Sequence, residues 1–118
     1  MDGNKHPTYK ALSHYTIMWL LVCFDLPTDT KIQRRNAAIF RKNLLKDGFS
    51  MMQFSVYIRH CATHESMDVH IQTVRTMIPP EGLVSIIRIT DKQFGDTITL
   101  CGRKSVPPPT TYTQLELF

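Results

Sequence analysis

The chain has 118 residues, of which 42% are hydrophobic and 20% charged, a composition that predicts one folded domain with a modest core and excludes a wholly disordered protein. Its formal net charge of +4 and pI near 9.1 are compatible with a polyanionic partner such as nucleic acid. No apolar run approaches the roughly 18 residues of a membrane-spanning helix, and the three cysteines show no CxxC spacing. We therefore expect a cytoplasmic protein with reduced thiols and no membrane partner.

Residues 1–16 contain Gly3, Pro7 and polar side chains without a hydrophobic period, so they are interpreted as a flexible N-terminal extension. The folded domain is expected to span residues 17–103. It begins with an unbroken apolar run, Met18 to Phe24, which is typical of a strand buried on both faces.

Asp25 follows this run at once, and Pro27 then ends the strand because proline cannot donate to a ladder. An acid is therefore placed where a central strand leaves its sheet, an edge at which ligands gather in open α/β-type sheets. The plainer interpretation is that Asp25 is a turn residue that hydrogen-bonds the backbone.

Residues 29–47 predict a helix with Gly48 at its C-terminal end. At 100° per residue, one side is apolar and carries Ile32, Ala37, Ile39, Phe40 and Leu44. The opposite arc carries six cations and no interspersed glutamate: Lys31, Arg34, Arg35, Arg41, Lys42 and Lys46. Such a face is either a solvated surface or, since solvated faces usually mix charges, a phosphate-binding surface.

Residues 49–61 are rich in strand formers and predict either one long bent strand or two short strands broken near 53–55. Alternation places Met52, Phe54, Val56 and Ile58 on one face of this segment. It places Ser55, Tyr57 and Arg59 on the opposite face.

Thr63 is the expected cap of a second helix, over about 64–78, whose core face carries Met67, Ile71, Val74 and Ile78. Leu83–Thr90 predicts a strand, 91–96 a loop and Thr97–Cys101 a short strand. Residues 104–118 combine a proline-rich arm with a terminal strand, Thr113–Phe118, that either pairs with its own sheet or crosses to a second subunit.

This element order predicts an α+β, ferredoxin-like split β-α-β sandwich: one antiparallel sheet with both helices on one face, plus a C-terminal strand. Among the chemical groups, His60, Cys61 and His64 lack a recognised metal spacing. Asp25 alone is a weak site for Mg²⁺, but a two-fold dimer would present two copies of it.

The sequence resembles a known family at two motifs. Val22 to Thr28 closes the first strand, and Gln53 to Tyr57 lies in the next, with the basic helix between them. This pair of motifs resembles the small CRISPR-associated Cas-two family, and Ile89 to Phe94 resembles its type II version. The likeness covers about residues 17–101.

The resemblance implies a ferredoxin-like homodimer with exchanged C-terminal strands. It implies a metal-dependent endonuclease in which Asp25 is the catalytic acid and binds Mg²⁺, and a partnership with a Cas-one-type integrase in acquiring spacers from duplex DNA. The resemblance carries over Arg34 and Arg35 as nucleic-acid-binding residues by their position on the basic helix, and the cationic face of that helix adds Arg41 and Lys42. Ser55 and Tyr57 are candidates for orienting water or phosphate.

Two kinds of function follow from these observations. One is a duplex-DNA-binding scaffold, RNA being an alternative ligand, with or without phosphodiesterase activity. The other is a small ferredoxin-like regulatory or interaction module without nuclease activity, which the fold by itself allows.

Overall fold

The computed structural model describes residues 18–102, so the predicted extension at 1–16 and the predicted arm and strand at 104–118 lie outside the described residues. The elements, in chain order, are β1 (Met18–Asp25), α2 (Lys31–Lys46), β2 (Ser50–Gln53), β3 (Val56–Cys61), α3 (His64–Thr76), β4 (Leu83–Thr90) and α4 (Asp91–Gly95). No helix among them is long and apolar enough to cross a membrane.

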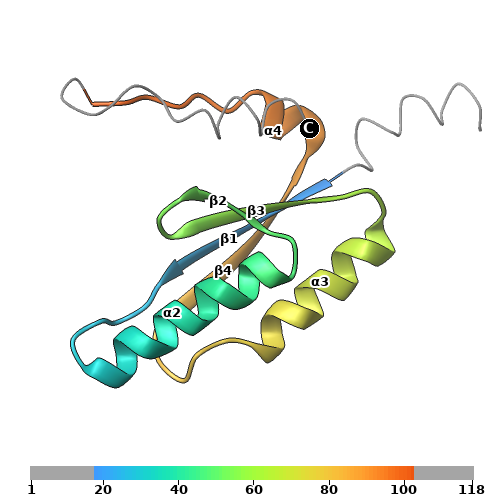
Figure 1. Ribbon diagram of the computed structural model, residues 1–118. Coiled ribbons are helices and arrows are strands. Elements are labelled where there is room, and N and C mark those ends of the chain that lie inside the picture. Colours follow the sequence, from blue (N-terminus) through green and yellow to red (C-terminus); the bar gives the residue numbers. More distant parts are fainter. Residues whose placement is uncertain (1–17, 103–118) are drawn as a thin grey trace, which may run out of the picture.

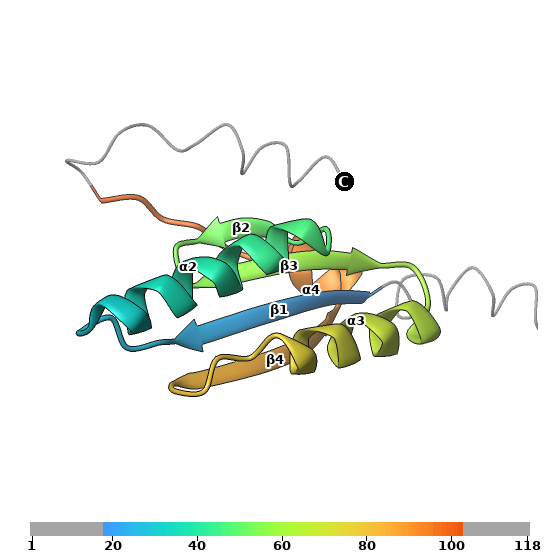
Figure 2. The same ribbon diagram turned by 60° about the horizontal axis from the view of Figure 1, so that its bottom comes forward.

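The four strands form one antiparallel sheet in the order β2-β3-β1-β4. The first strand is central and pairs with β3 on one side and with β4 on the other. Both long helices, α2 and α3, lie against the same face of the sheet (Figures 1 and 2). This arrangement confirms the predicted α+β, ferredoxin-like plan.

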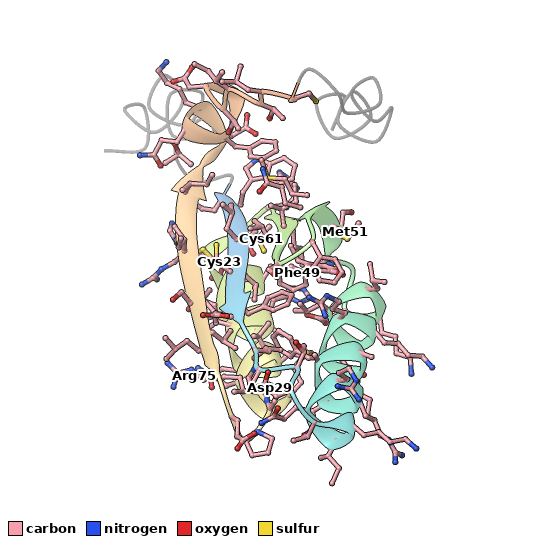
Figure 3. All side chains as sticks on the ribbon, turned by 90° about the vertical axis from the view of Figure 1, so that its left-hand side faces the viewer. Cys23, Asp29, Phe49, Met51, Cys61 and Arg75 are labelled. Carbon is pink, nitrogen blue, oxygen red and sulfur yellow. The ribbon has the colours of Figure 1, made fainter. Side chains whose placement is uncertain are left out.

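The main core lies between the sheet and the two long helices. Alternate residues of β1 enter it, namely Leu20, Val22 and Phe24, and each is at most 6% exposed. They pack with buried residues of the helices and of β3: Phe40, Leu44, Tyr57, Cys61, Met67 and Val74. Figure 3 shows Phe49 pointing into this layer, whereas Met51 lies at the outer edge, where it is half exposed.

A capping box fixes the start of α2. The Thr30 hydroxyl accepts from the Gln33 amide, and the Gln33 side chain accepts from the Thr30 amide. At the other end Gly48 has a φ of +90° and is covered by the Arg59 guanidinium, which also donates to the Asp47 carbonyl (2.8 Å). A side chain at residue 48 would collide with this guanidinium, so the predicted glycine ending is confirmed.

The predicted apolar side of α2 was partly wrong. Ala37, Phe40 and Leu44 are buried, but Ile32 and Ile39 are 71% and 44% exposed. The buried stripe centres on the three residues that meet the sheet, and the two isoleucines lie beyond its border.

The remaining elements agree with the sequence except near the end of the domain. Residues 49–61 form two strands around a turn at 54–55, which is the second of the two predicted alternatives. Helix α3 ends at Thr76, so Ile78 is not part of its core face. Residues 91–95 form α4 instead of a loop, because Thr90 and Gln93 make a second capping box. The strand predicted at 97–101 is not formed.

A second, smaller cluster lies on the sheet face that α2 and α3 leave uncovered. It centres on Trp19 and Ile58, with Leu21, Met52, Ile89 and Phe94 packed against them. Helix α4 supplies Phe94, whose ring stacks on Trp19 at a centroid distance of 4.1 Å. Asp91 accepts a 2.8 Å hydrogen bond from the Trp19 indole nitrogen. We call this uncovered side of the sheet the open face.

Candidate nucleic-acid interface and metal site

Asp25 is the last residue of β1 and is exposed at the end of the open face opposite to α4. Residues 19, 21, 23 and 25 alternate with the core residues of β1, so the Asp25 side chain shares the face of Trp19 and Cys23. Within residues 18–102 the Asp25 carboxylate has no hydrogen bond or ion pair. The plainer interpretation, a carboxylate engaged with the turn backbone, is therefore wrong, and the group is free to meet a ligand.

The backbone that carries Asp25 is tightly held. Gly82 has a φ of +103°, and a Cβ built on it would lie 2.8 Å from the Asp25 carbonyl oxygen and 3.0 Å from the Leu26 Cα. A side chain at residue 82 would therefore push the Asp25–Leu26 backbone away from β4.

Hydrogen bonds secure the turn that follows Asp25. The Gln33 carbonyl oxygen Oε1 accepts from the amides of Asp29 (2.9 Å) and Thr30 (3.0 Å), and its Nε2 donates to Glu81 (2.7 Å). This links the start of α2 to the turn that contains Gly82. The free carboxylate thus stands on a backbone fixed from two sides.

Apolar side chains surround this end of the open face. Leu83, the register partner of Asp25, is 74% exposed, and Ile87 is 43% exposed. Cys23 is half-buried on the same face, and Leu21, opposite Ile87, continues into the Trp19 cluster. Exposed apolar side chains beside an unpaired carboxylate are the features of a surface that a second molecule covers.

The residues fit Mg²⁺ in part. Among residues 18–102 no group of three or more histidine, cysteine, aspartate or glutamate side chains could hold a metal ion. His60 and Cys61, the other candidates, point to opposite faces of β3, and burial raises the pKa of the Cys61 thiol. Mg²⁺ is commonly held by one or two carboxylates together with water and substrate phosphate, so a pair of Asp25 side chains from two chains would meet its needs.

The structure separates the two residues suggested for orienting water. Ser55 lies in the β2–β3 turn, where its carbonyl accepts from the Phe24 amide (3.1 Å), one residue from Asp25. Tyr57 is 2% exposed in the core between sheet and helices, on the face opposite to Asp25. The backbone of Ser55 therefore lies next to the end of β1 that carries Asp25, whereas Tyr57 packs the core and does not face the candidate site.

The six cations of α2 divide into two sets. Lys31, Arg35, Lys42 and Lys46 are exposed and form no ion pair with residues 18–102; we call them the basic ridge. Figure 3 shows nitrogen-bearing side chains extending from α2 away from the sheet.

The other two cations are held by the chain itself. Arg34 donates to the carbonyls of Thr28 (3.0 Å) and Asp29 (3.2 Å), and Arg41 donates to the carbonyl of Phe54 (3.3 Å). Of the four residues expected to bind nucleic acid, Arg35 and Lys42 thus stand on the basic ridge, and Arg34 and Arg41 brace neighbouring loops.

Residues 18–97 match the family model described as CRISPR associated protein Cas2. Similar proteins are each named CRISPR-associated endoribonuclease Cas2. One from Flavobacterium psychrophilum is 48% identical over 93% of this chain and 96% of its own length. One from Parvibaculum lavamentivorans is 48% identical over 86% of this chain and all of its own. One from Paracidovorax avenae is 41% identical over 91% of this chain and 99% of its own length.

Proposed function

The chain belongs to the Cas2 family of CRISPR-associated proteins, and on that basis we propose that it acts as a homodimeric nucleic-acid-binding protein with Mg²⁺-dependent phosphodiesterase activity. The observation that carries the proposal is the Asp25 end of the open face. There an unpaired carboxylate, fixed by its backbone, is surrounded by exposed apolar side chains.

A second copy of the chain is the proposed cover of this face. A two-fold axis through the Asp25 end would bury Leu83 and Ile87 against their counterparts and bring two Asp25 carboxylates together. The free edge of β4 within residues 18–102 is available to a strand of the partner, in keeping with the expected exchange of C-terminal strands.

In the proposed reaction a water oxygen attacks the scissile phosphorus, the bond to the leaving oxygen breaks, and that oxygen takes up a proton. The paired Asp25 carboxylates would hold Mg²⁺, which, when bound, neutralises negative charge that develops on the phosphate. Ser55, in the adjacent turn, is the residue that we expect to donate a hydrogen bond to a phosphate oxygen or to the water. The names of the relatives support this class of reaction.

The basic ridge would bind the sugar-phosphate backbone. Two chains carry twice the +4 of one chain, and the ridges of a symmetric dimer would contact one duplex at two places. We propose that the dimer holds duplex DNA in this way for a Cas-one-type integrase during spacer acquisition. A scaffold role needs the ridge, whereas cleavage needs Asp25 as well.

The test is a side-by-side assay of the wild type and Asp25→Asn on single-stranded RNA, single-stranded DNA and duplex DNA, with Mg²⁺ and with EDTA. We expect cleavage by the wild type that EDTA abolishes and that Asp25→Asn lowers about a thousandfold, a loss of about 4 kcal/mol in transition-state stabilisation. Cleavage that persists in Asp25→Asn would contradict the proposed site.

Binding distinguishes the scaffold from a small regulatory module without nuclease activity. Duplex affinity that falls steeply with salt and is unaffected by Asp25→Asn supports the scaffold. A chain that does not bind duplex DNA, or whose affinity for it does not change with salt concentration, would favour the regulatory module.

A further inference from the structure

A column of stacked groups rises from the core to the surface at the end of the sheet where β1 ends. Its base is Phe24, which is 6% exposed, and its middle is the Arg41 guanidinium, whose Cζ lies 5.1 Å from the Phe24 ring centroid. Its outer member is Phe54, with the same Cζ 3.8 Å from its ring centroid. We call these three residues the aromatic column.

The outer end of the aromatic column is an open aromatic surface. Phe54 is 70% exposed although Arg41 covers one side of its ring, so the ring face turned away from Arg41 meets solvent. Arg41 also holds the backbone under this ring, because its Nε donates to the Phe54 carbonyl at 3.3 Å. A large apolar ring held in place and left exposed is costly to hydrate and is ready to stack on a planar partner.

The column lies at the same end of the sheet as the candidate catalytic residue, with Phe24 on the helix-covered face and Asp25 on the open face. The Phe24 amide donates to the Ser55 carbonyl at 3.1 Å, so Phe54 and Asp25 are each one residue from this contact. Arg41 brings a positive charge to the same place, and the basic ridge continues along the helix that carries it. An aromatic ring flanked by cations is the combination with which proteins bind single-stranded nucleic acid.

From this juxtaposition we propose that Phe54 is a base-stacking subsite, at which an unpaired nucleobase extends the aromatic column while its strand continues around the end of β1 to Asp25. This inference rests on the proposed function in taking nucleic acid as the ligand. It names the substrate feature recognised beside the acid: the face of a base, a feature that intact duplex exposes only at its ends.

The test measures binding of the full chain, without Mg²⁺ so that no cleavage intervenes, to a fluorescent single-stranded oligonucleotide. Phe54→Ala and Phe54→Leu are each expected to weaken binding about tenfold, and Phe54→Trp to bind as the wild type does. Ile32→Ala is the matched control, since Ile32 is equally exposed on the basic helix but has no ring. Thermal unfolding verifies that each variant is folded.

Two further probes identify what is recognised. On a strand whose central residues are abasic, Phe54→Leu should bind no more weakly than the wild type, because there is no base to stack. On a blunt duplex of equal length, a smaller loss of affinity in Phe54→Leu than on the single strand identifies an unpaired base as the stacking partner. An equal loss of affinity identifies a terminal base of the duplex instead.

Retention of wild-type affinity by Phe54→Leu would overturn the inference, since any apolar side chain would then suffice. The inference would also be overturned if Phe54→Leu weakened binding of the abasic strand as much as binding of the normal strand. Failure of the proposed function is a separate result: if no Asp25-dependent cleavage exists but the Phe54 variants lose binding as expected, the stacking subsite stands and the catalytic role of Asp25 falls.

Discussion

The two ends of the open face are built in opposite ways. At one end Trp19 is 2% exposed, stacks on Phe94 and has its indole nitrogen bonded to Asp91, all within one chain. At the other end the Asp25 carboxylate has no partner within residues 18–102, its register partner Leu83 is exposed, and Ile87, between the two ends, is also exposed. One β-strand therefore joins a completed cluster to an incomplete one. The Trp19 end is thus built for stability, and the Asp25 end is the one at which we propose binding.

The largest expected effect on folding is at the completed end. Trp19→Ala removes a buried indole and its hydrogen bond, and should lower the free energy of unfolding by about 3–5 kcal/mol. Asp25→Ala removes an exposed side chain without partners, and should change it by less than about 0.5 kcal/mol. Urea denaturation measures both, and equal losses would contradict the division of roles.

The next effect concerns association. Ile87→Glu places a charge on the face that a second chain is proposed to cover, and should raise the dimer dissociation constant about a hundredfold, or roughly 2.7 kcal/mol. Ile32→Glu is the control, because Ile32 is also exposed but lies on α2. Sedimentation equilibrium gives both constants, and a dimer that tolerates Ile87→Glu would place the interface elsewhere.

A smaller effect concerns the backbone that holds Asp25. Gly82→Ala would push on the Asp25 carbonyl, and should raise the Mg²⁺ concentration for half-maximal cleavage about tenfold, as changes around metal ligands do. Gly95→Ala is its match, since nothing lies within 4 Å of a Cβ there. An unchanged metal requirement in Gly82→Ala would show that the turn does not position the carboxylate.

The smallest effect is at single cations of the basic ridge. Lys42→Gln should lower the slope of log affinity against log salt for duplex DNA by about 0.9 for each phosphate that residue 42 no longer neutralises. Lys92→Gln should leave the slope unchanged, because Lys92 lies on α4 and faces Asp96 at 3.7 Å. Equal slopes for Lys42→Gln and the wild type would exclude Lys42 from the interface.

The sequence predicted those parts of the fold that local pattern determines. The strand Leu83–Thr90 was found with its observed bounds, and the Asp25 strand end followed from an apolar run and a proline. Helix α4 was missed although its signal, threonine followed three residues later by glutamine, stands in the sequence at Thr90 and Gln93.

Other features depend on contacts between distant segments. Ile32 is exposed because of how α2 is rotated about its axis against the sheet. The periodic pattern of the sequence has a wide apolar arc and could not predict this rotation. The approach of Gly82 to Asp25 and the stacking of Arg41 on Phe54 join segments far apart in the chain. Predicting Asp25 as an acid at the end of a strand was possible from one sequence, whereas predicting that its carboxylate is unpaired, or what holds its backbone, was not.

The central claim is that two Asp25 carboxylates share one ion across a dimer formed at the open end. The most direct measurement is the stoichiometry of Mn²⁺, used in place of Mg²⁺, by isothermal titration calorimetry of the full chain. We predict one ion for every two chains, with binding lost both in Asp25→Asn and in Ile87→Glu. One ion for each chain, retained in a monomeric Ile87→Glu variant, would contradict the account.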